Sequence, residues 1–442
     1  MTTSKQFFKI TPANANSANN FSYSKSGVPL VTFELPVMDG FLVPNSLRLN
    51  WKMTGSNITV GDNDAVFNDI YVGQAGSIQN ITISSFASRN VLEQIRNYPR
   101  LLSGILPNQS DSSEFLSRQQ FNYFATGNNQ VGNKSNITQQ YQDIQPVASN
   151  RLSPGAEISM PIVTGLLSSS NPIPLSATWG TQGLRIEFEL SPDTNFYQVA
   201  QQAGVKPQYE ISEVSLTGEY YLPSLEEVNM LNQQGEGAFS FNAYTSLYSV
   251  VDSGTSTHSF NLGLRNVIGA FMNFTNASFV NNYLQNGLQS TQLLNSSGVN
   301  TQLDRLIMDR SGVQFPNLFQ LDFTRNSTQP YLMYQVWNML KGYVRTFYNS
   351  VSFSTNAQSQ QFGQPGQVMS STNSASYLNT VNYQVAIPTA PIDRVGTSYA
   401  GRPLGFTLFA NDLTDETQNS LYLFVLARHS IMYGNGQIQV IS

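Results

Sequence analysis

The sequence predicts a mainly β protein built from two similar antiparallel units, and three observations support this. Stretches such as "LRLNWKM" (47–53) and "LRIEFEL" (184–190) alternate strictly between apolar and polar residues. Clusters of Gly, Pro, Asn and Ser interrupt these stretches at short intervals. The same order of elements also occurs twice along the chain. Alternation with one polar face is typical of antiparallel sheets with a solvated side, and frequent turn signals favour a sandwich or barrel.

The first elements are an arm and two strands. Residues 1–27 lack periodicity, and we interpret them as a flexible N-terminal arm. In "VTFEL" (31–35) the apolar residues Val31, Phe33 and Leu35 share one face. The stretch 47–53 follows with four apolar residues in one phase. Each of these stretches therefore predicts a strand with one buried face.

Two helices are predicted. The first begins at Asn90, an N-cap with Glu93 three residues later in a capping-box pattern, and Pro99 ends or kinks it. The second covers 327–344, with Pro330 in the first turn, where its missing N–H costs nothing. Both carry apolar stripes, which we interpret as faces packed on a sheet. The first stripe comprises Val91, Leu92, Ile95 and Tyr98.

The order of elements repeats after a nearly constant offset. Strand, helix and hairpin signals lie near residues 29, 90 and 184, and again near residues 257, 330 and 420. Such repetition indicates two copies of one supersecondary plan. We divide the chain into an N-terminal arm (1–27), a first domain (28–222) and a second domain (223–442). Within the second, residues 223–256 are expected to be a connection with a short helix.

The composition combines a large core with few charges. At 442 residues the chain exceeds the size at which one core usually stops growing, which favours two domains. Hydrophobic residues make up 40% and charged residues only 11%, against about 25% in an ordinary globular protein. The surface must therefore be built from Asn, Gln, Ser and Thr. A weakly self-repelling surface of this kind suits packing against many copies of the same chain; a soluble protein with an amide-rich surface is the alternative.

Several classes of protein are disfavoured. The net charge is −5 without a long Lys/Arg run, so no direct nucleic-acid binding is expected, because phosphate neutralisation drives such binding. The absence of cysteine excludes disulfides, cysteine catalysis and thiolate metal sites. No stretch approaches 18 apolar residues, and the N-terminus lacks the apolar core of a signal peptide. We expect the chain to be made and kept in the cytosol or nucleus.

Three segments carry a resemblance to a known family. They are "VPLVTFELPVMDGFLVPNSLRLNWKMTG", "AGSIQNITISSFASRNVLEQIRNYPRLLSGIL" and "IPLSATWGTQGLRIEFELSPD". An antiparallel unit of about eight strands with an embedded helix, repeated in tandem, matches the double jelly-roll plan. In that context the segments resemble the strand B–C, strand–helix and strand H regions of double jelly-roll major capsid proteins. The resemblance is to the adenovirus, virophage and polinton-like DNA virus lineage and covers most of the chain in order.

The resemblance implies a fold, a function and partners. The fold would be two tandem eight-stranded antiparallel jelly rolls with short embedded helices. The chain would be a major capsid protein in the virion capsid, assembled in the host cytoplasm or nucleus, whose homotrimers form pseudo-hexagonal capsomers of an icosahedral DNA virus shell. Implied partners are neighbouring capsomers, penton proteins and minor or cement proteins. The N-terminal arm would run along the inner side, where an internal membrane is a further candidate contact.

No catalytic, cofactor-binding or metal-ligating residue is predicted. The common hydrolase, nucleotide-binding and zinc-protease motifs are absent, and the only histidines are His258 and His429. His258 is in phase with apolar strand residues, which favours a packing role. Asp62, Asp64 and Asp69 lie together but lack the Gly and final Glu of an EF-hand loop, so we interpret them as a solvated turn. The chain is not expected to be an enzyme; a jelly-roll glycan-binding or receptor-binding viral surface module remains the alternative.

The C-terminal hairpin has a strand of unusual composition. Residues 421–427 are apolar without interruption, which is too apolar for a strand with one solvated face. The pattern predicts a central strand buried against its own domain on one side and another element on the other. The turn near Gly434 and Gly436 then reverses the chain, with His429 at its shoulder.

Overall fold

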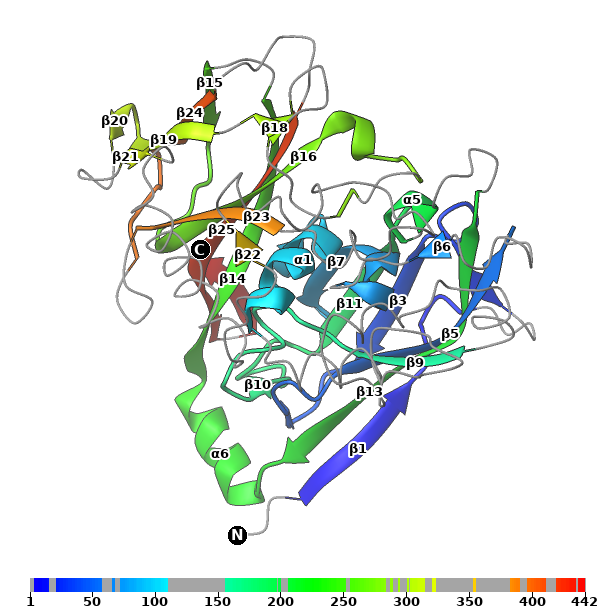
Figure 1. The fold of residues 1–442 in the computed structure, drawn as a ribbon. Helices are drawn as coiled ribbons and strands as arrows, with labels where there is room; N and C mark the ends of the chain where they lie inside the picture. Colours follow the sequence, from blue (N-terminus) through cyan, green and yellow to red (C-terminus); the bar gives the residue numbers. More distant parts are fainter. Residues whose placement is uncertain are drawn as a thin grey trace, which may run out of the picture.

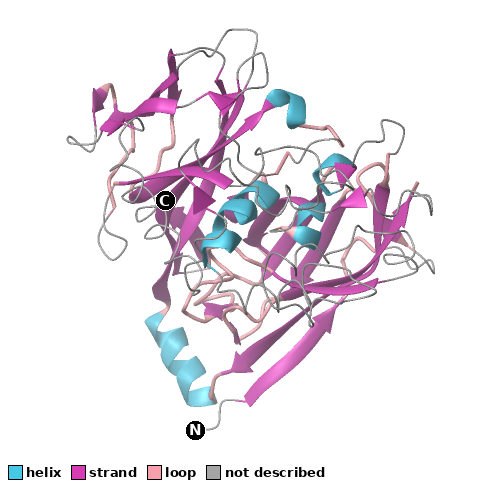
Figure 2. Cartoon of the chain, viewed as in Figure 1, coloured by secondary structure: helices cyan, strands magenta, loops and turns pink. Residues whose placement is uncertain are grey.

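The structure is a computed structural model and is mainly β, as predicted (Figure 2). It describes residues 4–15, 21–57, 66–67, 72–109, 156–196, 198–199, 206–251, 255–283, 287–288, 293–294, 300–301, 303–314, 320–322, 353–354, 382–389, 396–410, 419–434 and 436–441. In this part of the chain, no helix is long and apolar enough to cross a membrane.

The first unit contains two antiparallel sheets (Figure 1). The four-stranded sheet has the order β3 (Leu30–Leu35), β11 (Leu184–Leu190), β7 (Ile78–Ser85) and β8 (Val91–Ile95). The second sheet has the order β10 (Ile173–Pro174), β4 (Phe41–Leu42), β13 (Gln208–Leu222), β5 (Arg48–Ser56) and β9 (Ala156–Pro161). Two more strands, β1 (Ser4–Ile10) and β2 (Ser22–Tyr23), pair with β13. Smaller elements are β6 (Val66–Phe67), β12 (Gln198–Val199), the 3-10 helix η2 (Gly73–Ser77), α1 (Tyr98–Gln109) and α5 (Asp193–Phe196).

The second unit repeats this plan. One sheet has the order β14 (Glu236–Val251), β25 (Asn419–Gly434), β16 (Val267–Asn276), β23 (Asn382–Pro388) and β22 (Phe353–Ser354), with β26 (Gln437–Ile441) also on β25. The other has the order β15 (Thr255–Phe260), β24 (Leu404–Ala410), β19 (Leu303–Arg310) and β20 (Val313–Gln314), with β21 (Gln320–Asp322) also on β19. Smaller elements are η5 (Ala277–Phe279), β17 (Leu293–Leu294) and β18 (Asn300–Thr301).

The predicted alternation is confirmed in the strands that carried it. Along β5, Leu49, Trp51 and Met53 are buried and the residues between them are half-buried. Strand β11 shows the same strict alternation over its whole length. Because successive side chains point to opposite faces of a sheet, these patterns place one face of each strand in the core.

The helix predicted from Asn90 is wrong in its position. Residues 91–95 form β8, which pairs with β7, and α1 begins only at Tyr98. Pro99 therefore lies in the first turn of α1 instead of ending a helix, a place where its missing N–H costs nothing. The capping-box signal fails because Glu93 takes other partners: its carboxylate accepts from Gly165 and Leu166. Sheet pairing overrides the local helical pattern.

The expectation of a flexible N-terminal arm is wrong for residues 4–10, and the second predicted helix cannot be compared with the structure. Within the segment expected to be a flexible arm, residues 4–10 form β1, paired along β13. Phe8 and Ile10 pack on the core, while Phe7 beside them is 82% exposed. Since Phe7 and Phe8 are adjacent, they hide the alternation in the sequence. The second predicted helix, 327–344, lies outside the described residues.

The connection between the units is shorter than 223–256. It contains α6 (Leu225–Gln234), which Ser224 and Glu227 cap in a reciprocal capping box. Gly235 ends the helix with a φ of 62°, a conformation that favours glycine. Strand β14 begins at Glu236 and pairs with β25 along its whole length. The register with β25 makes residues 236–251 part of the second unit.

Candidate assembly surfaces

The central strand β25 is buried on both faces over residues 419–427, as the composition of 421–427 predicted. Leu421, Leu423 and Val425 belong to the core of the second unit. Tyr422, Phe424 and Leu426 belong instead to the cluster that also contains the core of the first unit. The two units therefore share one continuous apolar contact. We call the contact of β14 and β25 with β8, α1 and the 163–168 segment the junction.

Aromatic side chains fill the side of the junction that the second unit contributes. The Phe271 and Phe424 rings stack with centroids 4.8 Å apart, and Tyr244 meets Phe271 edge-on at 5.4 Å. All three side chains are fully buried. Aromatic pairs in such geometries stabilise beyond the area they bury, by about 0.5–1.5 kcal/mol. The junction is therefore packed like a domain core.

A buried carboxylate organises the first unit's side of the junction. Glu93 Oε1 accepts from the Gly165 N–H and Oε2 from the Leu166 N–H, both at 2.8 Å. Burial raises the pKa of Glu93 to about 7, although these hydrogen bonds and one from Thr164 act against the shift. Gly165 lies directly against β14. A Cβ there would collide with the Asn242 carbonyl oxygen and lie 2.8 Å from the Ala243 Cα.

A buried arginine links α1 to the second unit. Arg100 Nη1 donates to Thr275 Oγ1 at 2.9 Å, and its guanidinium carbon lies 3.9 Å from the centroid of the Tyr422 ring. The Asn273 side-chain amide donates to the Arg100 carbonyl oxygen at 3.1 Å. Burial lowers the pKa of the Arg100 guanidinium, and Tyr422 and Tyr248 oppose this shift. The arrangement combines a cation–π contact with hydrogen bonds across the junction.

Sequence reasoning missed Glu93 and Arg100 as junction residues. Glu93 was interpreted as a helix-capping residue, and Arg100 carried no prediction. The available signal was a charged residue next to strongly apolar neighbours in 91–102. This pattern shows that the charged group is buried only if the groups that bind it are known. For Glu93, one of those groups is the Gly165 N–H, which lies 72 positions away in the sequence.

Amide side chains of the first unit cover the free edge of the C-terminal hairpin. Asn90 Nδ2 donates to the Ile438 carbonyl oxygen at 3.0 Å, and Gln182 Nε2 donates to that of Gly436 at 2.6 Å. Both acceptors belong to β26 or the turn before it. An uncovered edge strand is a template for pairing with another chain, so these contacts protect the hairpin as well as dock it.

Removing both amides with Asn90→Ala and Gln182→Ala is expected to loosen the hairpin. Each loss should lower the free energy of unfolding by about 1 kcal/mol, because a carbonyl loses its donor. Hydrogen exchange of residues 430–441 should rise while that of β11 stays unchanged. Gln94→Ala, which removes an exposed amide contact to Thr82, is the control. Unchanged exchange of the hairpin in the double variant would show that the amides do not hold it.

The two histidines lie in different surroundings. His258 is buried, as expected of a packing residue, and its Nδ1 lies 2.8 Å from Ser249 Oγ. His429 stacks on Phe241 with ring centroids 5.8 Å apart, and burial lowers its pKa to about 4. Within the described residues, no group of three or more His, Asp or Glu side chains could hold a metal ion. Asp62, Asp64 and Asp69 lie outside those residues.

The low pKa of His429 predicts a loss of stability in acid. Between about pH 4 and 6.5 the folded chain binds fewer protons at His429 than the unfolded chain, so this contribution falls as the pH falls. His429→Phe keeps a ring against Phe241 and should flatten the pH dependence in that window. Urea unfolding at pH 7 and at pH 4.5 measures the effect. An identical loss of stability in both proteins would contradict the prediction.

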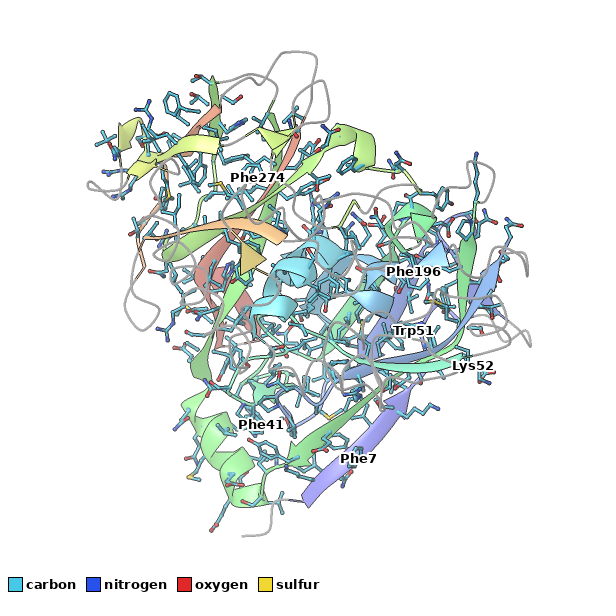
Figure 3. The ribbon with its side chains drawn as sticks, in the orientation of Figure 1. Phe7, Phe41, Trp51, Lys52, Phe196 and Phe274 are labelled. Atoms are coloured by element: carbon cyan, nitrogen blue, oxygen red, sulfur yellow. The ribbon has the colours of Figure 1, made fainter. Side chains whose placement is uncertain are left out.

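Exposed apolar side chains gather at one end of the first unit. Phe7 on β1, Leu222 at the end of β13, and Leu225 and Met230 on α6 are all exposed, Leu225 by 83%. Figure 1 shows β1, the end of β13 and α6 together at the end where the N-terminus lies, and Figure 3 labels Phe7 there. Helix α6 has no buried residue. We call these four residues the basal patch; clustered exposed apolar residues mark contact surfaces.

Comparisons with known proteins identify similar structures but no similar sequence. No protein-family model matches the chain, and no curated protein matches it. The PBCV-1 capsid protein matches with a TM-score of 0.59 at 10% identity, over 100% of this chain and 98% of that one. The Faustovirus major capsid protein matches with 0.59 at 8%, over 98% and 91%. The mavirus major capsid protein matches with 0.51 at 13%, over 98% and 89%.

These neighbours define the fold. They are double jelly-roll capsid proteins, so the two units described above are two jelly rolls in tandem. The resemblance predicted from the sequence is confirmed as a likeness in fold, which covers nearly the whole chain. The predicted fold class, a mainly β double jelly roll with short helices, is also confirmed.

Proposed function

We propose that this chain is a major capsid protein, the structural subunit of an icosahedral DNA virus shell, and that it resides in the virion capsid. The observation that carries the proposal is the junction, in which apolar residues of both jelly rolls form one buried cluster. Two jelly rolls joined in this way would present two unlike outer edges. Three such chains around a threefold axis would give a capsomer with six jelly rolls and a pseudo-hexagonal outline.

The proposed function also includes a division into domains, a set of assembly partners and a structural, non-enzymatic role. We retain the division into an N-terminal segment (1–27), a first jelly roll (28–222) and a second jelly roll (223–442), and we note that β1 and β2 of the segment pair with β13 of the first jelly roll. The homotrimer would contact neighbouring capsomers, penton proteins and minor or cement proteins. The neighbours in fold are structural proteins, and we propose that this chain is likewise not an enzyme. It has a net charge of −5, which does not favour direct contact with nucleic acid.

The basal patch is proposed as a surface for contacts between the capsomer and other parts of the shell. Phe7→Ser should leave the trimer intact and change the free energy of unfolding by no more than about 0.5 kcal/mol, since the side chain is exposed. Particle yield on expression with the other shell proteins should fall. Val313→Ser, at an exposed position of β20 in the second unit, is the matched control. A normal particle yield with Phe7→Ser would remove Phe7 from the assembly surface.

Oligomeric state tests the proposed function. Size-exclusion chromatography with light scattering should give a trimer or a larger assembly. The alternative, a jelly-roll module that binds glycans or a receptor, predicts a stable monomer that binds a glycan array. That combination of results would overturn the capsid proposal.

A further inference from the structure

Glu93 lies in the junction without a basic partner among the described residues. Its carboxylate is buried, and its hydrogen bonds come from the Gly165 and Leu166 backbone and from Thr164. None of the ion pairs in the described part of the chain includes it. A buried charge without an opposite charge is costly, and protonation removes that cost.

The contacts of Glu93 extend to the second unit through Gly165. The carboxylate holds the 164–166 turn, and Gly165 in this turn fits against Asn242 and Ala243 of β14 without space for a Cβ. Separating the two units would remove the β14 backbone from the turn that this carboxylate holds, and so would change the surroundings of Glu93. The protonation of Glu93 is therefore linked to docking, because the docked and separated states place the same carboxyl group in different surroundings.

We propose that Glu93 is a proton-binding site of the junction, so that proton uptake by this carboxyl group favours docking of the two jelly rolls. In the docked state its pKa is about 7, above the ordinary value of 4.5. The docked state thus holds a proton between about pH 4.5 and 7 that the separated state releases. The stabilisation is fully present near pH 4.5 and is lost as the pH rises through 7.

Other charged or titratable groups on the elements around Glu93 could add to the pH dependence of docking. Strand β7 and the 163–168 segment carry none. Helix α1 contributes Tyr98 and Arg100, and β14 contributes Glu236, Tyr244 and Tyr248. Strand β25 contributes Tyr422, Tyr433, and Arg428 and His429 opposite Asn242 and Phe241. His429 acts with the opposite sign, since its contribution is lost as the pH falls below about 6.5. Comparing the wild type with a Glu93 variant at each pH cancels the His429 effect.

The test compares the full-length wild type with Glu93→Gln, which keeps the shape of the side chain but cannot ionise. Equilibrium unfolding is measured from pH 5 to 8 under conditions where it is reversible. The ratio of the unfolding constants, wild type over Glu93→Gln, should rise about tenfold per pH unit between pH 5 and 7 and then level off. Glu210→Gln, the same change at an exposed position of β13, is the control: the ratio of unfolding constants, wild type over Glu210→Gln, should not change with pH. A flat ratio for Glu93→Gln would overturn the proposal.

Hydrogen exchange gives a second measurement that does not depend on the variant folding. In the wild type, peptides covering 160–168 and 238–246 should show more frequent opening as the pH rises from 5.5 to 7.5, after correction for intrinsic exchange. Peptides covering β11 should show no such change. An opening frequency at 160–168 that is independent of pH would equally overturn the proposal.

Discussion

Leu426→Ala is expected to separate the two jelly rolls, whereas Leu423→Ala should weaken the second one internally. The two leucines lie on the same strand and are both fully buried, but on opposite faces. Each truncation should lower the free energy of unfolding by about 2–5 kcal/mol, because it removes buried methyl groups and leaves a cavity. The two variants differ in the contacts that they lose: Leu426→Ala loses contacts in the cluster shared by both units, and Leu423→Ala loses contacts in the core of the second unit.

Hydrogen exchange distinguishes the two effects. With Leu426→Ala, exchange should rise in α1, whose Arg100 lies over the Tyr422 ring of β25, and in β8, which contacts β14 across the junction. With Leu423→Ala, it should rise in β24 and β19, on the opposite sheet of the second unit. The pair acts as its own matched control, since residue type and burial are the same. Indistinguishable exchange patterns would contradict the assignment of the two faces of β25.

Gly165→Val should have the second large effect, because there is no room for a side chain at this position. A Cβ would meet the backbone of β14, which cannot move aside as a flexible side chain can. Forcing atoms into a packed site costs about 1–3 kcal/mol and more where backbone must move. We expect a loss of about 3 kcal/mol in the free energy of unfolding, measured by denaturant titration, together with a larger radius of gyration in X-ray scattering.

The control for this prediction is Ser170→Val, at an exposed position in the same loop between β9 and β10. It introduces the same side chain at an exposed position, and surface substitutions usually stay within about 0.5 kcal/mol. If Gly165→Val and Ser170→Val had equal stability, the close approach of the 164–166 turn to β14 would not contribute to docking.

The strands were predictable from the sequence because side-chain alternation is a local property. The alternation at 47–53 and 184–190 and the uninterrupted apolar run at 421–427 depend only on neighbouring residues, and the structure confirms all three. The short helix expected within 223–256 is likewise present, as α6. Such signals need no knowledge of the rest of the fold.

The junction could not be predicted in the same way. The segment from Asn90 has a helical pattern, but pairing with β7 makes it a strand. The contacts of Glu93 and Arg100 join residues 72 and 175 positions apart. No local pattern specifies which distant backbone groups will meet a buried charge. The apolar run 421–427 predicted a second buried face without naming the unit that covers it.

Electron microscopy of the purified protein tests the central claim most directly. The proposed function predicts particles with threefold symmetry in which six jelly rolls surround a ring, giving a pseudo-hexagonal outline. Within each particle, the two jelly rolls of one chain should meet through the face of β25 that carries Phe424 and Leu426. Isolated single chains at every protein concentration, or particles in which β25 lies on an outer surface, would contradict it.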